Sequence, residues 1–363
     1  METTKYCARF LLFACIVVAS LGAIQVHAAD GSVVIGVNSW YTPPNMSEED
    51  MVKQLAASGV KTIRCSLFPG HADFIIKAFQ HGIGTIAIVY PHTNSTAKKK
   101  RSWADVPLSE LKPQEFTDGF KPMLDYLEAA GVRLAAIELG NEINTSGYNG
   151  DIASPGSGRV LGIRDLNNPN DAEARPIAAG FQVYVKIMAA LKDLRDHSKL
   201  NKATPILSGA SGDWGLPGPK SWSNQLGVSV PDSIEFLREN GLDKLVDGYA
   251  VHVYPSGDLH RSISMRVASL EQYVFGECKH GTKPCWLTEW GFPNRSQSCP
   301  INDATRTQVI EAQRSAFKQF AQQGRLAAII YYTWSAPATK PDPMAVFRCD
   351  ALTDAGKLAL RPL

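Results

Sequence analysis

The chain has 363 residues, of which 44% are hydrophobic and 20% are charged. Its 37 Lys and Arg residues nearly balance its 35 Asp and Glu residues, for a formal net charge of +2. This balance gives no electrostatic basis for binding nucleic acid or an anionic membrane surface. The length allows one large domain or two smaller ones.

The first 29 residues have the pattern of a secretory signal peptide. Lys5 and Arg9 form a charged start, an apolar run FLLFACIVVASLGAI follows, and small residues end it at Ala28 and Ala29. An uncleaved membrane anchor is the alternative, although the apolar run is shorter than the ~20 residues that a spanning helix needs. We predict that residues 30–363 are a secreted or periplasmic monomer with no membrane contact after signal removal.

Removal of the signal would leave five cysteines, an odd number that an oxidising compartment cannot pair completely. Two bridges among five cysteines can form in 15 ways. We favour Cys278–Cys285 across a short turn and Cys299–Cys349 between two loops, with Cys65 as a buried free thiol. No pair has CxxC spacing, so a structural zinc site is not expected.

From residue 32 onward, β-rich segments alternate with amphipathic helical segments. The predicted strands cover 32–40, 60–68, 82–91, 132–144, 203–211, 244–255, 283–293 and 325–335. Helical patterns fill most of the intervals, and the first begins at an N-cap serine, Ser47, with Asp50 three residues later. Several strands follow a glycine that suits a helix C-cap, namely Gly59, Gly82, Gly131, Gly241 and Gly324.

Eight β-then-α units in one chain predict a single (β/α)₈ TIM barrel formed by residues 30–363. A doubly wound open sheet is the alternative, but no GxGxxG motif follows the first strand. The segment 145–172 after the fourth strand is rich in Gly, Ser, Asn and Pro, and we expect it to cover part of a cleft.

In such a barrel, functional residues gather at the carboxyl ends of the strands. Polar and aromatic residues do follow the predicted strands in this chain. They are Trp40 after the first strand, Arg64 on the second, Asn141 and Glu142 on the fourth, His252 and Tyr254 on the sixth, Glu289 and Trp290 on the seventh, and Trp334 on the eighth.

Glu142 and Glu289 are the candidate catalytic pair. Two carboxyl groups across a cleft suit cleavage of a glycosidic bond, since one donates a proton and the other acts as the anion. Their environments must then push their pKa values apart. We expect Arg64 and Tyr254 to hold the carboxylate of Glu289, and His252 to lie near Glu142.

The other candidates are predicted to bind the sugar. Aromatic faces stack on pyranose rings, and we expect this of Trp40, Trp290 and above all Trp334. Asn141 would donate a hydrogen bond to a sugar hydroxyl. Strand alternation from Glu289 turns Trp286 toward the helices, where it would pack in the core.

The segments LGNEIN and WLTEWGFP resemble the two catalytic strands of the clan A glycoside hydrolases, a retaining (β/α)₈ group that includes family 5. The resemblance implies that Glu142 is the acid/base and Glu289 the nucleophile. It extends to the family's Arg, Asn, His-x-Tyr and Trp positions, here Arg64, Asn141, His252, Tyr254 and Trp334. Many members have Pro after the acid/base, and Ile143 stands there instead, which leaves the exact family open.

The signal-peptide pattern and the resemblance together predict a secreted retaining hydrolase of a β-linked oligosaccharide or polysaccharide, for which we expect no metal or cofactor. Two alternatives retain the same barrel, a catalytically silent glycan-binding protein and a transglycosylase that uses the same residues. A metal-dependent hydrolase using His71, His92, His252 and an Asp is a third alternative, but no HxH or HExxH-like pair supports it.

Overall fold

The computed structural model describes residues 33–39, 42–43, 46–102, 104–209, 211–212, 225–254, 283–296, 298–337 and 341–363. The proposed signal peptide, Trp40 and Cys278 lie outside these residues. Within the described part of the chain, no helix is both long and apolar enough to cross a membrane.

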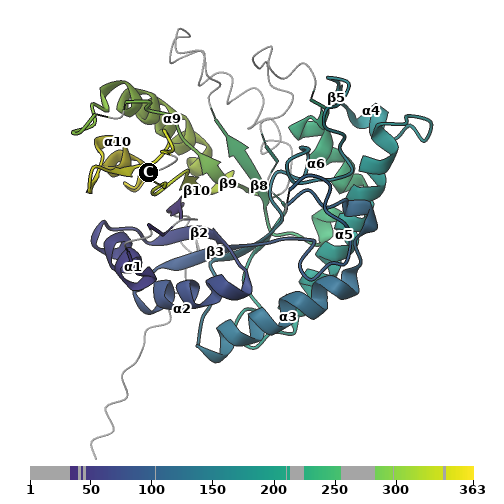
Figure 1. The fold of residues 1–363 in the computed structure, drawn as a ribbon, viewed down its shortest axis with the longest axis horizontal. Helices are drawn as coiled ribbons and strands as arrows, with labels where there is room; N and C mark the ends of the chain where they lie inside the picture. The colour runs from purple at the N-terminus through teal and green to yellow at the C-terminus, as the bar shows by residue number, and fades with distance from the viewer. Residues whose placement is uncertain are drawn as a thin grey trace, which may run out of the picture.

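Eight parallel strands form the barrel that the sequence predicts (Figure 1). Their order is β6-β4-β3-β2-β1-β10-β9-β8, and parallel bridges from Leu207 to Gly248 and from Ser211 to Val251 link the first of these strands to the last. The strands are β1 (Val34–Asn38), β2 (Thr62–Ser66), β3 (Gly84–Val89), β4 (Ala136–Leu139), β6 (Ile206–Leu207), β8 (Tyr249–Val253), β9 (Cys285–Trp290) and β10 (Leu326–Tyr331).

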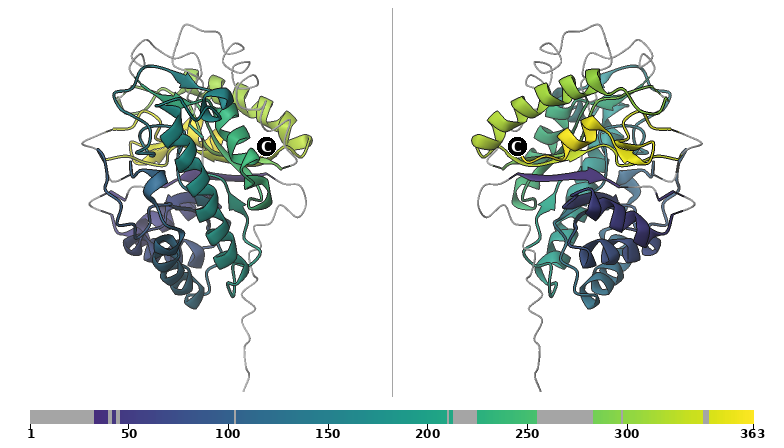
Figure 2. Two further views of the ribbon diagram at one scale, coloured as in Figure 1. Left: turned by 90° about the vertical axis from the view of Figure 1, so that its right-hand side faces the viewer. Right: turned by 90° about the vertical axis from the view of Figure 1, so that its left-hand side faces the viewer.

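Helices cover the outside of the strands, as Figures 1 and 2 show. The helices between strands are α1 (Glu48–Ala57), α2 (Ala72–Gln80), α3 (Pro113–Ala129), α5 (Ala174–Asp196), α6 (Val230–Glu239) and α9 (Ala304–Gln322), and α10 (Asp354–Ala359) follows β10. Short additions include helix α4 (Ile163–Leu166), the pair β5 (Val160–Leu161) with β7 (Gly227–Val228), and the hairpin β11 (Phe347–Arg348) with β12 (Ala351–Leu352).

The helix boundaries follow the signals in the sequence. The hydroxyl of Ser47 accepts a hydrogen bond from the Asp50 amide and caps α1. The five glycines predicted as C-caps all have positive φ angles, between 66° and 97°. Each cap returns the chain from a helix to the start of the next strand. Because the strands are parallel, their carboxyl ends all lie at the same rim of the barrel.

Small and branched side chains fill the barrel interior together with one large ring, that of Trp286. The prediction that Trp286 faces the helices is wrong, and the cause is a bulge in β9. Val251 pairs with Leu287 but His252 pairs with Glu289, so β9 holds one extra residue between them. A bulge reverses the alternation beyond it, and Trp286 and Glu289 therefore both point inward despite their odd separation.

A disulfide joins Cys299 to Cys349, as predicted, and the two positions are 50 residues apart. It ties the segment after β9 to the turn of the β11–β12 hairpin. Cys65 is a buried free cysteine, also as predicted. The pairing of Cys285 with Cys278 remains a prediction, because Cys278 lies outside the described residues.

Removing the Cys299–Cys349 bridge is expected to lower the free energy of unfolding by about 4 kcal/mol, because a cross-link over a 50-residue loop restricts the unfolded chain. Urea unfolding of the double variant Cys299→Ser/Cys349→Ser measures the loss. Cys349→Ser alone should lose the same amount, since either change breaks the same bond. A loss below about 1 kcal/mol in both variants would contradict the expectation.

Candidate active site

Glu142 follows β4 at the barrel rim, where the backbone changes direction at two residues. Gly140 has a φ of 89° and Glu142 a φ of 41°, both in the left-handed region. This conformation is costly for a residue other than glycine and is found preferentially at functional sites. The Thr145 amide and hydroxyl donate hydrogen bonds to the Glu142 carbonyl at 2.9 and 3.0 Å and hold the turn.

The carboxyl of Glu142 lies in a poorly hydrated position. Its side chain keeps 27% exposure, but protein encloses the carboxyl on most sides. This desolvation raises the pKa of Glu142 to about 7, against a smaller opposing effect of the Arg64 charge. A carboxyl with such a pKa holds a proton near neutrality, as a general acid must.

Glu289 has a contrasting environment. Arg64 Nη1 donates to one carboxylate oxygen at 2.7 Å, and the Tyr254 hydroxyl donates to the other at 2.5 Å. Both contacts were predicted from the sequence, and together they fix the direction of the carboxyl group. The bulge in β9 aims Glu289 inward at this point.

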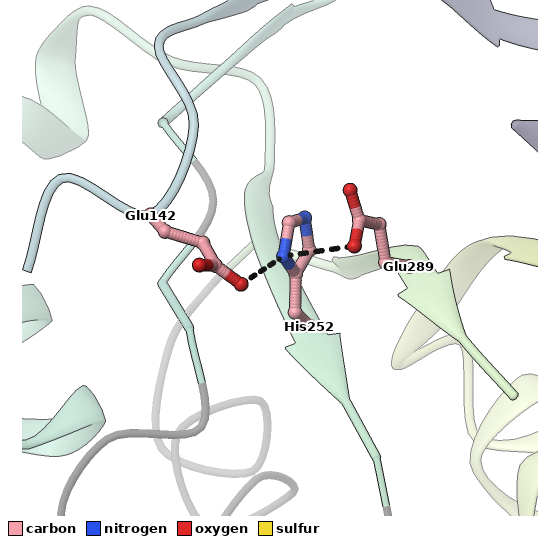
Figure 3. Close-up of side chains that lie close together, drawn as sticks. All are labelled: Glu142, His252 and Glu289. Atoms are coloured by element: carbon pink, nitrogen blue, oxygen red, sulfur yellow. Dashed lines mark hydrogen bonds and ion pairs between the residues drawn. The ribbon is translucent and has the colours of Figure 1, made fainter. Parts of the chain in front are cut away.

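His252 lies between the two carboxyl groups, as Figure 3 shows. Its Nδ1 is 2.9 Å from Glu142 Oε1, the predicted contact, and 3.4 Å from Glu289 Oε2. Burial lowers the pKa of His252 to about 4, so the ring is neutral at ordinary pH. One ligating atom from each of the three residues falls within 4.8 Å of the others.

Arg64 ties the strand ends together from inside the barrel. It is 1% exposed, and its five N–H groups all have acceptors. Two bonds form a fork with Glu138 at 2.7 and 2.8 Å, one goes to Glu289, and the others go to Asn38 Oδ1 at 3.0 Å and Asn141 Oδ1 at 2.8 Å. The amide of Asn141 is therefore oriented by Arg64 on the cavity wall.

Glu138 and Asn38 are site residues to which the sequence reasoning gave no role. Glu138 is fully buried in the apolar strand β4 and faces the barrel interior. A lone glutamate inside an apolar run needs a buried cation, so the run AIEL carried a signal for a partner such as Arg64. Asn38 ends β1, where its amide also donates to the Thr288 carbonyl at 3.0 Å.

A cavity of about 250 Å³ opens beside Glu289. Polar and aromatic side chains make up most of its lining, which comprises Asn38, Arg64, Cys65, Ser66, Ile88, Tyr90, Asn141, Tyr148, Glu289 and Tyr332. Tyr148 comes from the segment after β4, so part of that segment forms a wall of the cavity as expected. Tyr90, Tyr148 and Tyr332 were not among the predicted site residues.

Two predicted sugar-binding residues are instead core residues. Trp334 is fully buried, its ring stacks on Phe347, and its Nε1 donates to Gln54 at 3.2 Å. Trp290 is also fully buried, edge-on to Phe317 and Tyr331. The prediction that they stack on substrate is wrong, because β10 ends at Tyr331 and because the β9 bulge turns Trp290 outward.

The place predicted for Trp334 at the end of β10 is taken by Tyr332. Continuing the inward alternation of Ala328 and Ile330 by one step leads to Tyr332, which lines the cavity. The peptide bond between Tyr332 and Thr333 is cis. The predicted contact of Trp40 lies outside the described residues and stays a prediction.

Glu142, His252 and Glu289 also offer the ligand types that Zn²⁺ accepts. The surroundings fit a metal ion poorly. The Arg64 cation is already 2.7 Å from Glu289, and His252 Nε2 has no hydrogen-bond partner among the described residues. A metal-ligating histidine almost always donates its second ring N–H to an acceptor. These surroundings suit carboxyl groups held by protein donors better than a metal ion.

No protein-family model matches the chain, and no curated protein matches it in sequence. Solved structures do match in fold. One is a family 39 glycoside hydrolase from Bacteroides cellulosilyticus WH2, with a TM-score of 0.55 and 14% identity over 91% of this chain. A second is the exo-β-1,4-mannosidase Op5Man5 from Opitutaceae bacterium strain TAV5, with a TM-score of 0.51 and 15% identity over 84% of this chain.

A β-glucosidase matches with a TM-score of 0.51 and 12% identity, over 86% of both chains. The match spans only 63% of the family 39 protein and 53% of the mannosidase. At these identities the likeness shows a shared barrel fold. The fold therefore agrees with the resemblance to clan A glycoside hydrolases that the two glutamate-bearing strands carry.

Proposed function

We propose that the protein is a retaining glycoside hydrolase that cleaves a β-linked glycan by double displacement. Glu289 attacks the anomeric carbon and forms a glycosyl-enzyme ester while Glu142 gives its proton to the leaving oxygen. Glu142 then takes a proton from water, which attacks the same carbon and releases the sugar and the Glu289 carboxylate.

The observation that carries the proposal is the opposed chemistry of two adjacent carboxyl groups. Burial favours a proton on Glu142, whereas an arginine and a tyrosine donate to both oxygens of Glu289. Oxygens of the two groups lie within 4.8 Å. That proximity supports retention, for which carboxyl groups stand ~5–5.5 Å apart, over inversion, which needs ~6.5–9.5 Å to admit water.

The cavity supports a sugar as the substrate. Its volume of about 250 Å³ suits a single sugar ring beside Glu289. Asn38, Asn141 and three tyrosines line this space, and tyrosine rings offer apolar faces to a sugar. The experiment that tests the proposal is a screen of 2,4-dinitrophenyl β-glycosides in the gluco, manno, galacto and xylo series, followed by plant and microbial polysaccharides.

The alternatives predict other results in that screen. A silent glycan-binding barrel would bind oligosaccharides in calorimetry without releasing dinitrophenolate from any glycoside. A transglycosylase would release dinitrophenolate but pass the sugar to an acceptor glycan rather than to water. A metal-dependent hydrolase would lose activity in EDTA and regain it with added metal, which the two-carboxylate mechanism does not allow.

The alkaline limb of kcat/KM is expected near pH 7. Glu142 must enter the reaction protonated, and its pKa is raised to about 7, so the active form is present below that pH and declines tenfold per unit above it. The pH profile should be measured with a glycoside whose leaving group is poor, because such a substrate needs the proton.

Glu142→Gln serves as the control for this profile. With the same poor-leaving-group substrate, which needs the proton, it should lower kcat/KM strongly, and the activity that remains should lack the alkaline limb. If the variant keeps the wild-type limb, another group donates the proton and the assignment to Glu142 is wrong.

We also propose export of the mature chain, because residues 1–29 have the signal-peptide pattern and a disulfide joins Cys299 to Cys349. Expression of the full chain in a secreting host, followed by N-terminal sequencing of the product, tests the cleavage near residue 29. Retention of Met1 on the exported or cell-bound protein would contradict cleavage.

A further inference from the structure

Gly212 lies directly against the carboxyl of Glu142. A Cβ atom added at Gly212 would stand 2.9 Å from Glu142 Cδ, 3.0 Å from Oε1 and 3.1 Å from Cγ. These separations are tighter than nearly all real Cβ contacts, so a side chain at this position would force the Glu142 carboxyl to shift. The backbone of Gly212 thus forms one side of the protein surface that encloses the Glu142 carboxyl.

Asn144 holds this backbone in place with both ends of its amide. Its Oδ1 accepts from the Gly212 amide at 2.9 Å, and its Nδ2 donates to the Gly212 carbonyl at 3.1 Å. Nδ2 also donates to the Val228 carbonyl at 3.0 Å, and the Val228 amide donates to the Asn144 carbonyl at 3.0 Å. Asn144 is fully buried, and it lies two positions after Glu142 in the chain.

We propose that Asn144 is a positioning residue for the acid/base, which acts by clamping the Gly212 backbone against the Glu142 carboxyl. The residue touches neither a sugar nor a reacting atom. It links the turn that carries Glu142 to the segment after β6. One side chain therefore fixes the position of the Gly212 backbone relative to the Glu142 carboxyl.

The charged and titratable groups around Glu142 explain why the clamp matters. They are Arg64 from β2, Tyr148 from the segment after β4, His252 from β8, Tyr254 after β8, Glu289 from β9 and Tyr332 after β10. Arg64 lowers the pKa of Glu142, and burial is the cause that raises it. Loss of the enclosure would therefore let the carboxyl titrate at a lower pH.

The test is a titration of Glu142 by carbon NMR in full-length mature protein labelled with ¹³C at the glutamate carboxyl. The Glu142 signal is identified by its absence in Glu142→Gln. Asn144→Ala opens the clamp, and Gly212→Ala forces the carboxyl away by adding the methyl group. Both variants are expected to lower the pKa of Glu142 by about one unit from its value of about 7.

Asn201→Ala is the matched control. Asn201 is equally buried and bridges backbone groups in the same way, accepting from Leu134 and donating to Val132, but it lies at the opposite end of β4. It should lower stability and leave the Glu142 titration unchanged. The proposal is overturned if Glu142 titrates as in wild type in the folded Asn144→Ala or Gly212→Ala protein, or if Asn201→Ala shifts it equally.

The catalytic meaning of the clamp rests on the proposed role of Glu142. The titration itself requires no substrate, so the two ideas fail separately. If Asn144→Ala lowers the pKa of Glu142 as expected but the wild type has no glycosidase activity, the clamp is supported and the proposed function is rejected. Where activity is found, the alkaline limb of kcat/KM should move down with the NMR value in both variants.

Discussion

Glu289→Ala is expected to reduce turnover of a 2,4-dinitrophenyl β-glycoside by at least about 10⁴-fold, because it removes the nucleophile. Added azide should restore part of the rate. The small anion can occupy the space of the lost carboxylate, where Arg64 and Tyr254 still donate, and attack the anomeric carbon. The product is then the α-glycosyl azide, which proton NMR identifies.

Glu142→Ala is the matched comparison. It should retain most activity on the dinitrophenyl glycoside at the first step, and azide should intercept the glycosyl-enzyme to give the β-glycosyl azide. The two anomers separate the roles of the two glutamates in one assay. An α-azide from Glu142→Ala and a β-azide from Glu289→Ala would reverse the assignment, and wild-type turnover by Glu289→Ala would reject it.

Arg64→Met is expected to cost about 3–5 kcal/mol of folding stability, because it leaves the buried carboxyl of Glu138 without its cation. Activity should fall as well, since Glu289 loses the donor that fixes one of its oxygens. Urea unfolding followed by circular dichroism measures the stability, and the aryl glycoside assay measures the activity.

The double variant Arg64→Met/Glu138→Leu distinguishes the two effects. Replacing the whole buried pair by apolar groups removes the uncompensated charge and should recover much of the lost stability. Activity should stay low, because the donor to Glu289 is still absent. The account of Arg64 is wrong if Arg64→Met is as stable as wild type, or if the double variant regains full activity.

The barrel and the polar strand ends could be predicted because both depend on local patterns. Alternation of strands and helices, glycine C-caps and the serine N-cap all act over a few residues, and the structure has them where the sequence places them. Arg64, His252, Tyr254 and the two catalytic candidates then meet at one rim simply because parallel strands end there.

Strand alternation failed to predict which side chains of β9 face the barrel interior, because β9 contains a bulge. One extra residue in β9 changes which side chains face the interior, and neighbouring strands, not the local sequence, decide whether the bulge forms. Trp286 and Trp290 were both misplaced for this reason. Trp334 was misplaced because the chain leaves the strand after Tyr331, so alternation no longer applies to it.

Contacts between residues that lie far apart in the chain could not be predicted from the sequence either. Glu138 looks like a misplaced charge until β2 brings Arg64 beside it, 74 residues away in sequence. The clamp from Asn144 to Gly212 spans 68 residues. Neither contact leaves a periodic pattern. The final residue of GNEIN thus carries a role that the preceding glutamate alone did not suggest.

The configuration of the first-formed product tests the central claim most directly. Proton NMR should follow hydrolysis of the best aryl β-glycoside from the screen in its first minutes, before the released sugar mutarotates. Double displacement by Glu289 and Glu142 predicts the β-anomer first, with the α-anomer appearing later. Initial release of the α-anomer would contradict the account, because it requires a water molecule between two carboxyl groups that this structure holds close together.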